Sequence, residues 1–431
     1  MSKRLDWDIV FYYRKTGRYA HNALAACVQQ RLEQDQFECH LHFPKTIEQL
    51  NAHINRSKHR NIIVLWSFYS PDAIAVKEEL AQIKVPDSIH QIIHIAGGVH
   101  ASAQPLQTLE LGFDYVAVGE GESIIDEISL AVMNNSDFNQ IKGLHYFDNQ
   151  QYIRNGKGKI VQLDNYPPCS IKFKRMGPIE ITRGCIYACQ FCQTPFFNKA
   201  RFRHRSIDNI AYHATRMHGA GFRDFRFVTP TAFSYGSYDD TVNMDAIEAL
   251  LAKIREIIAR RGRLFYGSFP SEIRPEHVSH SHLNTLKKYV DNDNIIIGGQ
   301  SGSDAMLVHS HRGHTVDDII RAVEISLKCG FKPNVDFLYG MPGEQLQDIE
   351  ATLALANKLA TMGARIHSHS FMPLPGTPFQ DYAPEPLPDK IIQQINHLHS
   401  SGLAYGQWQA QQAIAQTILD SKTSKSTSVD S

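Results

Sequence analysis

The sequence of 431 residues predicts two α/β domains in series: a doubly wound, flavodoxin-like N-terminal domain and a C-terminal partial barrel of six βα units. Two observations lead to this prediction. Short apolar runs that are typical of buried parallel strands alternate with helix-length segments along most of the chain. A polar, irregular stretch over residues 141–175 separates two such series, and a chain of this length usually needs more than one hydrophobic core.

The strand-like runs define both domains. In the first series, helical segments separate runs at residues 8–13, 61–67, 91–98 and 115–122. In the second series, the runs lie at residues 178–182, 224–228, 263–267, 294–298, 333–339 and 365–370. We therefore expect an N-terminal domain at 1–140, a linker at 141–175, a barrel at 176–385, a C-terminal helical segment at 386–420 and a disordered polar tail at 421–431.

Composition narrows the possible functions. Lys plus Arg and Asp plus Glu both total 44, so no global basic field attracts nucleic acid or anionic lipid. The chain has no apolar run long enough for a membrane span, and its first residues lack the hydrophobic stretch of a signal peptide. Seven cysteines, an odd number, argue against a disulfide framework and for a reducing compartment. We expect a cytoplasmic protein without a membrane or nucleic-acid partner.

Three of those cysteines form a short motif at the end of the first barrel strand. Cys185, Cys189 and Cys192 have the spacing C-x3-C-x2-C, which can wrap three corners of a [4Fe–4S] cluster and leave the fourth iron open. A zinc site is the alternative, but zinc needs a fourth ligand at short spacing, and the next histidine, His204, lies twelve residues beyond Cys192. The motif therefore indicates a catalytic cluster.

The motif, with Phe191 just before the third cysteine, resembles that of the radical S-adenosylmethionine (radical SAM) superfamily. The resemblance implies that SAM chelates the open iron and is reductively cleaved to methionine and a 5′-deoxyadenosyl radical. It places Phe191 beside the adenine. It also implies a low-potential electron donor of the flavodoxin or ferredoxin type.

Polar residues after later barrel strands resemble the SAM-binding segments of that superfamily. Ser268 and Glu272 follow the third strand, and the resemblance assigns them ribose or amino contacts. Gln300, Ser301 and Arg312 follow the fourth, where the superfamily holds the ribose and the carboxylate. Gly340 begins a Gly-x-Pro-Gly-Glu turn after the fifth strand and is expected near the adenine. Residues 229–233 lack the acid that the superfamily often places after the second strand.

The N-terminal series resembles the cobalamin-binding domain that precedes many radical SAM cores. The resemblance rests on Ser67 and the pair Gly97-Gly98, separated by about the family interval, and on the Gly119–Glu122 turn. It implies that Ser67, Gly97, Gly98, Gly119 and Gly121 border the nucleotide tail of cobalamin. The family's Asp-x-His-x-x-Gly loop has no match in residues 10–60. Either the corrin is bound without a histidine on its lower face, or the domain no longer binds it.

These features predict a radical SAM enzyme acting on a small molecule. Cobalamin-linked methyl transfer to an unactivated carbon is the leading hypothesis. A radical cyclisation or rearrangement without cobalamin, and a non-catalytic iron–sulfur sensor, are the alternatives. His367 and His369 share one face of the sixth strand, so they face either the substrate or the barrel lumen. The sequence does not specify the substrate.

Overall fold

The computed structural model describes residues 3–426 and divides the chain into two compact units, Met1–Gly177 and Pro178–Ser431. Each unit is described separately below. Among residues 3–426, every helix is too short or too polar to cross a lipid bilayer.

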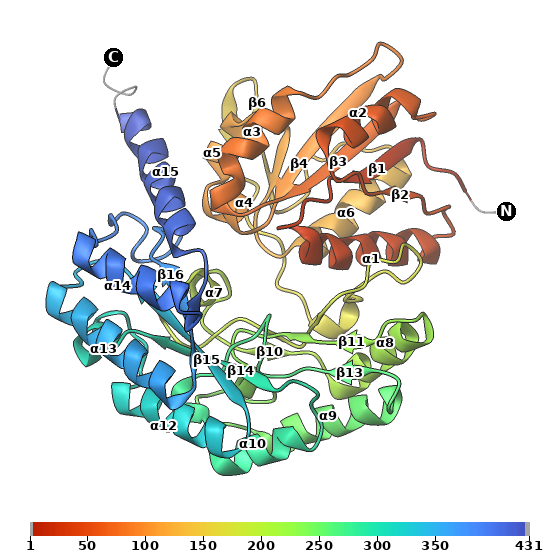
Figure 1. Ribbon diagram of the computed structural model, residues 1–431. Coiled ribbons are helices and arrows are strands. Elements are labelled where there is room, and N and C mark those ends of the chain that lie inside the picture. The colour runs from red at the N-terminus through yellow and green to blue at the C-terminus, as the bar shows by residue number, and fades with distance from the viewer. Residues whose placement is uncertain (1–2, 427–431) are drawn as a thin grey trace. The chain divides into compact units, whose positions relative to one another are not determined.

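The N-terminal unit is built on a seven-stranded sheet with the order β2-β1-β3-β4-β5-β6-β7 (Figure 1). The first five strands run parallel, and β6 and β7 add an antiparallel hairpin to one edge. The order 2-1-3-4-5 is that of a flavodoxin-like sheet, as predicted. The strands are β1 (Trp7–Phe11), β2 (Leu41–His42), β3 (Asn61–Ser67), β4 (Gln91–Gly97), β5 (Tyr115–Ala117), β6 (Leu144–Asp148) and β7 (Gln151–Ile153).

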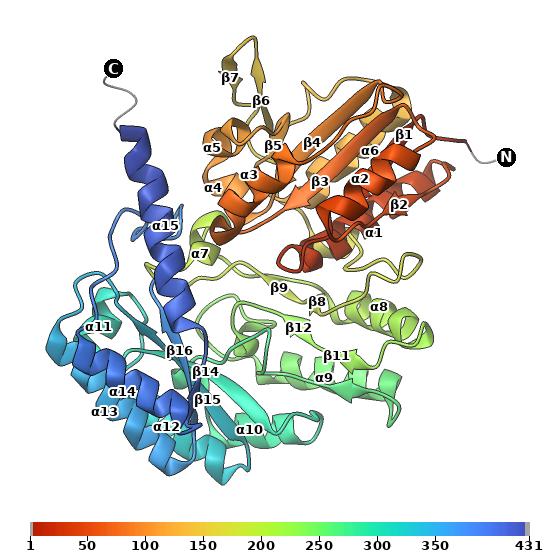
Figure 2. The same ribbon diagram turned by 45° about the horizontal axis from the view of Figure 1, so that its top comes forward.

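Both faces of this sheet are buried. Successive residues of β1 and Tyr12, which follows it directly, alternate between two clusters: Ile9 and Phe11 pack on one side, and Val10 and Tyr12 pack on the other. Helices α1 and α6 cover the first face, while α2, α3, α4 and α5 contribute apolar side chains to the second (Figure 2). The helices are α1 (Arg18–Gln34), α2 (Ile47–Arg56), α3 (Ala73–Ala81), α4 (Val99–Ala103), α5 (Pro105–Glu110) and α6 (Gly121–Asn134), with 3₁₀ turns η1 (Ser70–Asp72) and η2 (Leu163–Asn165).

Residues 141–175, which we expected to be a linker, belong to this first unit. Strands β6 and β7 lie within the segment and extend the sheet. Ile141 and Leu144 are buried in the same cluster as α1 and α6. Only a few apolar residues anchor the segment among many polar ones, which explains why its composition suggests a linker.

The C-terminal unit is an open barrel whose strands follow one another in chain order. Parallel pairs join β8 to β12 and β11 to β13, and β14, β15, β16 and β17 pair in succession. The segment after β13 contacts β14 through a hydrogen bond from Ile296 N–H to Gly267 O (2.9 Å). This confirms the predicted α/β partial barrel. The strands are β8 (Ile179–Glu180), β9 (Thr182–Arg183), β10 (Arg203–His204), β11 (Asp224–Phe225), β12 (Phe227–Val228), β13 (Arg263–Leu264), β14 (Asn294–Gln300), β15 (Lys332–Tyr339), β16 (Arg365–Ser370) and β17 (Ala404–Tyr405).

Helices form the outer layer of this barrel (Figure 1). Several begin at side-chain caps. Thr315, for example, accepts a hydrogen bond from Asp318 N–H, and the Asp318 carboxylate accepts one from Thr315 N–H in return. The helices are α7 (Gln193–Phe197), α8 (Ile207–Gly219), α9 (Met244–Ile258), α10 (His280–Lys287), α11 (Asp304–His309), α12 (Val316–Lys328), α13 (Leu346–Met362), α14 (Asp389–Ser400) and α15 (Trp408–Ser426), with 3₁₀ turns η3 (Ala232–Ser234) and η4 (Pro275–His277).

The segment after the barrel is helical, as expected, and also contains β17, which pairs with β16. Helix α15 continues to Ser426, so it enters the tail that we expected to be disordered from residue 421. Its start is anchored by buried Trp408 and Ala415, and a helix propagates readily from such an anchored end. Residues 427–431 of the predicted tail lie outside the described residues.

Candidate active site

The three motif cysteines lie on the loop between β9 and α7, at the carboxyl end of the first barrel strand. The loop begins at Gly184, which has a φ of +85°, and a Cβ there would lie 2.1 Å from Arg201 O. Any side chain at this position would collide with the backbone, so glycine is required. Cys192 N–H donates to Cys189 O (3.1 Å) and tightens the turn between the second and third cysteines.

All three cysteines line one cavity of about 330 Å³ within the C-terminal unit. Phe191 also lines it and packs against a buried cluster that includes Leu338 and Phe371. Residues that follow or end other barrel strands form most of the remaining wall, where active sites of such barrels gather. They include Thr231, Glu272, Arg274, Gln300, Arg312, Asp336, His369 and Met372, and Tyr187 of the cysteine loop and Gln411 of α15 also line the cavity.

The cysteine thiols fit an iron–sulfur cluster. Burial raises the pKa of Cys185 to about 12 and also raises that of Cys192. Without a metal, the thiols of Cys185 and Cys192 are therefore protonated at neutral pH. Positively charged iron would compensate the thiolates that burial disfavours. Three converging sulfur ligands, with no fourth cysteine lining the cavity, match a cubane with one open iron.

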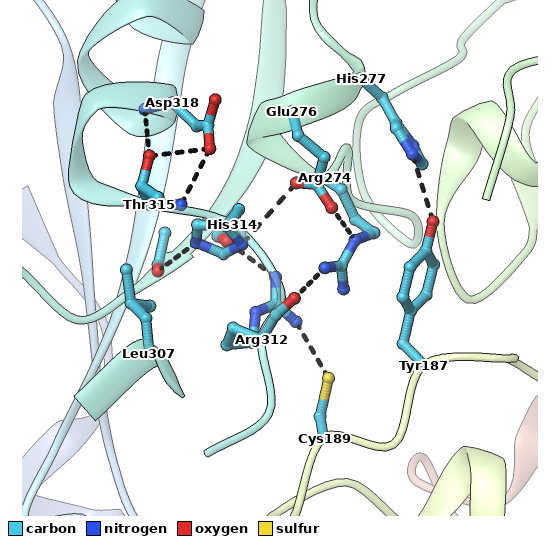
Figure 3. A network of polar contacts seen from close by, with 12 residues as sticks. Tyr187, Cys189, Arg274, Glu276, His277, Leu307, Arg312, His314, Thr315 and Asp318 are labelled. Atoms are coloured by element: carbon cyan, nitrogen blue, oxygen red, sulfur yellow. Dashed lines mark hydrogen bonds and ion pairs between the residues drawn. The ribbon is translucent and has the colours of Figure 1, made fainter. Parts of the chain in front are cut away.

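Arg312 provides a buried positive charge beside the cysteines (Figure 3). Its Nη1 lies 3.6 Å from Cys189 Sγ, and its Nη2 donates to Gly298 O at 2.8 Å. A Cβ at Gly298 would lie 2.8 Å from the guanidinium, so glycine there makes room for it. The Arg312 Nε–H is buried and has no hydrogen-bond partner among the described residues, so it remains available to a ligand.

A second buried arginine, Arg274, supports this arrangement. It donates to the Arg312 carbonyl oxygen and to the Glu276 carboxylate, and its guanidinium lies 3.6 Å from the centre of the Tyr187 ring (Figure 3). Burial raises the pKa of Glu276, but the charge and hydrogen bond of Arg274, a backbone hydrogen bond and His314 together outweigh it, and the net shift is downward. His314 lies 3.7 Å from Glu276, and burial lowers its pKa to about 3. The network thus holds two cations and one anion behind the cysteines.

Glu272 and Gln300, both predicted to bind SAM, reach the cavity. Glu272 lies 3.8 Å from Arg312 Nη2; burial raises the pKa of this carboxyl, and the arginine charge opposes the rise. Gln300 has a left-handed φ of +70° at a register shift in β14, a strained conformation typical of functional sites. Together with Arg312, the carboxylate and amide can bind the ammonium, hydroxyl and carboxylate groups of SAM.

Three predicted SAM contacts do not line the cavity. Ser301 is fully buried, and its hydroxyl lies 3.3 Å from Thr352 Oγ1. Gly340 N–H donates to the Glu344 carboxylate at 2.7 Å, so the Gly-x-Pro-Gly-Glu turn is closed on itself. Ser268 is buried with its hydroxyl unpartnered among the described residues. The structure thus places Phe191, Glu272, Gln300 and Arg312 together with the cysteines.

The structure adds Asp336 on β15, which sequence reasoning missed. Asp336 and His369 on β16, one of the two histidines noted in the sequence, both line the cavity. His367 Nδ1 is 3.0 Å from Asp336 Oδ1 and 3.0 Å from His369 Nε2. Asp336 stands between the apolar residues Val335 and Phe337, and this break in an apolar strand was the signal that could have identified it.

The predicted cobalamin contacts lie at carboxyl ends of the N-terminal sheet. Gly98 and Gly119 have φ values of +94° and +106°, so both turns expose backbone that a side chain would hinder. A Cβ at Gly17 would lie 2.2 Å from Ser67 O, which brings the loop after β1 close to the end of β3. This is the position where the strand order reverses, and ligands of doubly wound sheets bind there.

A hollow of about 570 Å³ lies in the same unit, lined by Ser102, Gln104, Val118, His145 and Arg154 among others. The five predicted cobalamin contacts do not line it, although Gly119 N–H donates to Ser102 Oγ at its border.

The N-terminal unit does not offer His21 as a ligand. Its side chain is 1% exposed, its ring packs 5.3 Å from the Phe11 ring, and both of its ring nitrogens lack partners among the described residues. In the loop after β1, Arg14 forms ion pairs with Asp72 (3.2 Å) and Glu79 (2.9 Å). The glycine turns at the switch point therefore fit a large cofactor that approaches backbone, without a histidine ligand from α1.

Comparison with known proteins agrees with this site. Residues 179–356 match the model of the radical SAM superfamily. A protein of Methanocaldococcus jannaschii named "Putative methylthiotransferase" is 25% identical over 314 residues, which cover 69% of this chain and 66% of that protein. The match thus leaves about a third of that relative uncovered.

Two solved structures share the fold over most of the chain. The radical SAM methyltransferase TsrM from Kitasatospora setae, with cobalamin and a [4Fe–4S] cluster bound, has a TM-score of 0.67 at 18% identity and covers 89% of this chain and 75% of its own. The cobalamin-dependent radical SAM enzyme OxsB has a TM-score of 0.63 at 14% identity and covers 93% of this chain and 56% of its own.

Residues 179–356 therefore form a radical SAM domain, and the chain shares its fold, over most of its length, with two cobalamin-dependent radical SAM enzymes. Members of this superfamily hold a [4Fe–4S] cluster and SAM, which the cavity residues fit.

Proposed function

We propose that this enzyme is a cobalamin-dependent radical SAM methyltransferase that acts on an unactivated carbon of a small molecule. The observation that supports it is one cavity in which three cysteines meet Glu272, Gln300 and Arg312, in a chain whose other unit has the fold of a B12-binding domain. When bound, the cluster and SAM would supply a 5′-deoxyadenosyl radical, and cobalamin would carry the methyl group.

The chain's own residues would bind and orient these groups. Cys185, Cys189 and Cys192 hold the cluster; Phe191 borders the adenine. The Arg312 guanidinium is available to the SAM carboxylate through its unpartnered Nε–H, and Glu272 is available to the amino group or ribose. Gly97, Gly98, Gly119, Gly121 and Ser67 are proposed to border the cobalamin tail.

The wall formed by β15 and β16 is the proposed substrate side. Replacing a hydrogen by a methyl group in the overall reaction leaves a proton to be removed. Asp336 and His369 are cavity groups that can accept it. Burial lowers the pKa of His369, so its ring is neutral at pH 7 and can take up a proton. Its ring nitrogens lie 3.0 Å from His367 Nδ1 and 3.2 Å from Gln411 Nε2. An electron donor of the flavodoxin or ferredoxin type is proposed to reduce the cluster.

Radical cyclisation or rearrangement without cobalamin is the second candidate. The observation that favours it is the loop after β1, where Arg14 is held by two carboxylates and His21 is buried. A domain of this kind could bind substrate instead of a corrin.

Anaerobic reconstitution with iron, sulfide and hydroxocobalamin tests the proposal. After desalting, we expect retained cobalamin absorbance near one equivalent, and 5′-deoxyadenosine after addition of dithionite and SAM. Formation of 5′-deoxyadenosine without retained cobalamin would favour the second candidate. Absence of 5′-deoxyadenosine from protein with a full cluster would contradict both.

A further inference from the structure

We propose that the N-terminal unit carries a metal site of its own, in which Asp8, His42 and His53 bind one Zn²⁺ ion. The three residues come from different elements: Asp8 from β1, His42 from β2 and His53 from α2. Asp8 lies near the amino end of β1, on the sheet face that α2 covers. The proposed cobalamin contacts lie instead at carboxyl ends of strands, so the two sites are distinct.

The donor atoms converge on one carboxylate. His53 Nε2 is 2.7 Å from Asp8 Oδ2, and His42 Nε2 is 3.1 Å from Asp8 Oδ1. The two imidazole rings lie next to each other, with centroids 4.0 Å apart and planes inclined by 36°. The three ligand atoms lie within 4.8 Å of one another, close enough to share one ion after small side-chain movements.

The charge balance at Asp8 favours a cation. The Asp8 side chain is 4% exposed, and within residues 3–426 its ion-pair partners are these two histidines. A carboxylate taken out of water is costly unless it is paired or coordinates a metal ion. A divalent ion held by the three side chains would compensate the buried charge directly.

The donor set is one that zinc prefers. Two imidazole nitrogens and one carboxylate oxygen form a common three-ligand zinc set, with water in the fourth position. Solvent can reach the site, because the side chain of His42 is 40% exposed. Ser57 Oγ–H donates to Asp8 Oδ2 at 3.0 Å and so orients the carboxylate, as second-layer partners do in metal sites.

The test uses the full chain with its cluster reconstituted, so that the cysteines are occupied. The protein is dialysed against limiting Zn²⁺, and bound zinc is measured by mass spectrometry. We expect one equivalent of zinc in the wild type, at least tenfold weaker binding in His42→Ala and in His53→Ala, and about tenfold weaker binding in Ser57→Ala. The same equivalent should bind to the triple variant Cys185→Ala, Cys189→Ala, Cys192→Ala.

His40→Ala is the matched control. His40 is two residues from His42, its side chain is 72% exposed, and it lies beside Glu38, so its loss should leave zinc binding unchanged. Thermal unfolding gives a second readout: zinc should raise the Tm of wild type and His40→Ala, but not of His53→Ala. Zinc stoichiometry that is the same in wild type, His42→Ala and His53→Ala would overturn the proposal, as would zinc that disappears with the three cysteines.

Discussion

The two units of this protein both have their proposed ligand contacts at carboxyl ends of parallel strands, but the chemistry of these contacts differs. In the barrel, the ends carry thiols and paired charges, such as Arg312 beside Cys189 and Arg274 beside Glu276. In the N-terminal sheet, the proposed contacts are mostly glycine turns, such as Gly98 and Gly119. The first kind of site depends on side-chain chemistry, and the second depends on backbone shape.

This difference predicts which substitutions will matter most. In the barrel, the loss of one side chain should abolish chemistry. In the N-terminal sheet, the addition of one side chain should weaken cobalamin binding, while the barrel should still form 5′-deoxyadenosine.

The largest effect is expected from Cys189→Ala. Because each cysteine supplies one of only three protein ligands, its loss should abolish the cluster and reduce 5′-deoxyadenosine formation to background. Iron content and product assay check this. Cys329→Ala is the control, since Cys329 is buried near Lys287, away from the cavity-lining residues, and should leave the iron content unchanged. A Cys189→Ala variant with full SAM cleavage would refute the assignment of the site.

Arg312→Met should have the next largest effect. The variant removes a charged donor from Cys189 Sγ and from the proposed SAM carboxylate contact, and hydrogen bonds from charged groups contribute about 1.5–3 kcal/mol. We expect a roughly tenfold to hundredfold slower SAM cleavage. Without SAM, the midpoint potential of the cluster should become more negative, because a cation favours the reduced, more negative state.

Redox titration monitored by EPR measures that potential. Arg205→Lys is the control: Arg205 is also a buried barrel arginine, and its guanidinium donates to Glu180 O and Asn209. An unchanged potential in Arg312→Met would limit this arginine to SAM binding.

Gly98→Ala tests the N-terminal unit instead of the barrel. A Cβ at Gly98 would lie 3.0 Å from Ser67 Oγ, and the backbone there (φ +94°, ψ −169°) has a glycine-type conformation that costs other residues about 1–3 kcal/mol. We expect several-fold weaker cobalamin retention and unchanged 5′-deoxyadenosine formation. Gly156→Ala is the matched control, because Gly156 also has a positive φ (+74°) but would meet nothing within 4 Å. Equal cobalamin retention in both variants would remove Gly98 from the proposed site.

The smallest effect on activity is expected from Glu344→Gln, which should change the pH dependence of stability. Burial raises the pKa of Glu344 from its ordinary value to about 7. Between the unfolded pKa and about pH 7, the unfolded chain loses this proton while the folded chain keeps it. The free energy of unfolding should therefore fall as pH rises through this range, by about 3 kcal/mol at most.

Denaturant unfolding at pH 5 and pH 8 checks this prediction. The glutamine side chain can still accept the hydrogen bond from Gly340 N–H and cannot ionise, so Glu344→Gln should be more stable than wild type at pH 8 and lack this part of the pH dependence. A variant that lost stability equally with wild type between the two pH values would show that another group is responsible.

The contrast between side-chain chemistry in the barrel and backbone shape in the N-terminal sheet also explains how much of the site could be predicted from sequence. The cysteine motif predicted three cluster ligands because their spacing is short and their chemistry is specific, and the structure places all three on one cavity. The alternating runs predicted both α/β folds. Glu272, Gln300 and Arg312 were predicted from the resemblance of the segments after successive strands, and they line the same cavity. Ser301 and Gly340 follow the same order, but their groups are used within the protein, by Thr352 and Glu344 respectively. Local sequence does not encode which side of a turn faces a cavity.

Long-range packing was the other limit. Asp336, His367 and His369 meet because β15 and β16 are paired in register, with Asp336 opposite His367. Asp8, His42 and His53 meet because α2 packs over β1 and β2. Neither group is visible as a spacing motif.

The central claim is that both units serve one methyl transfer, and one isotope experiment tests it without knowledge of the substrate. Cluster-loaded protein carrying hydroxocobalamin is incubated under reducing conditions with SAM that bears a trideuterated methyl group, and the protein-bound cobalamin is analysed by mass spectrometry. The account predicts a trideuteromethyl group on the bound cobalamin. Cobalamin that is retained but unlabelled, while 5′-deoxyadenosine accumulates, would contradict it.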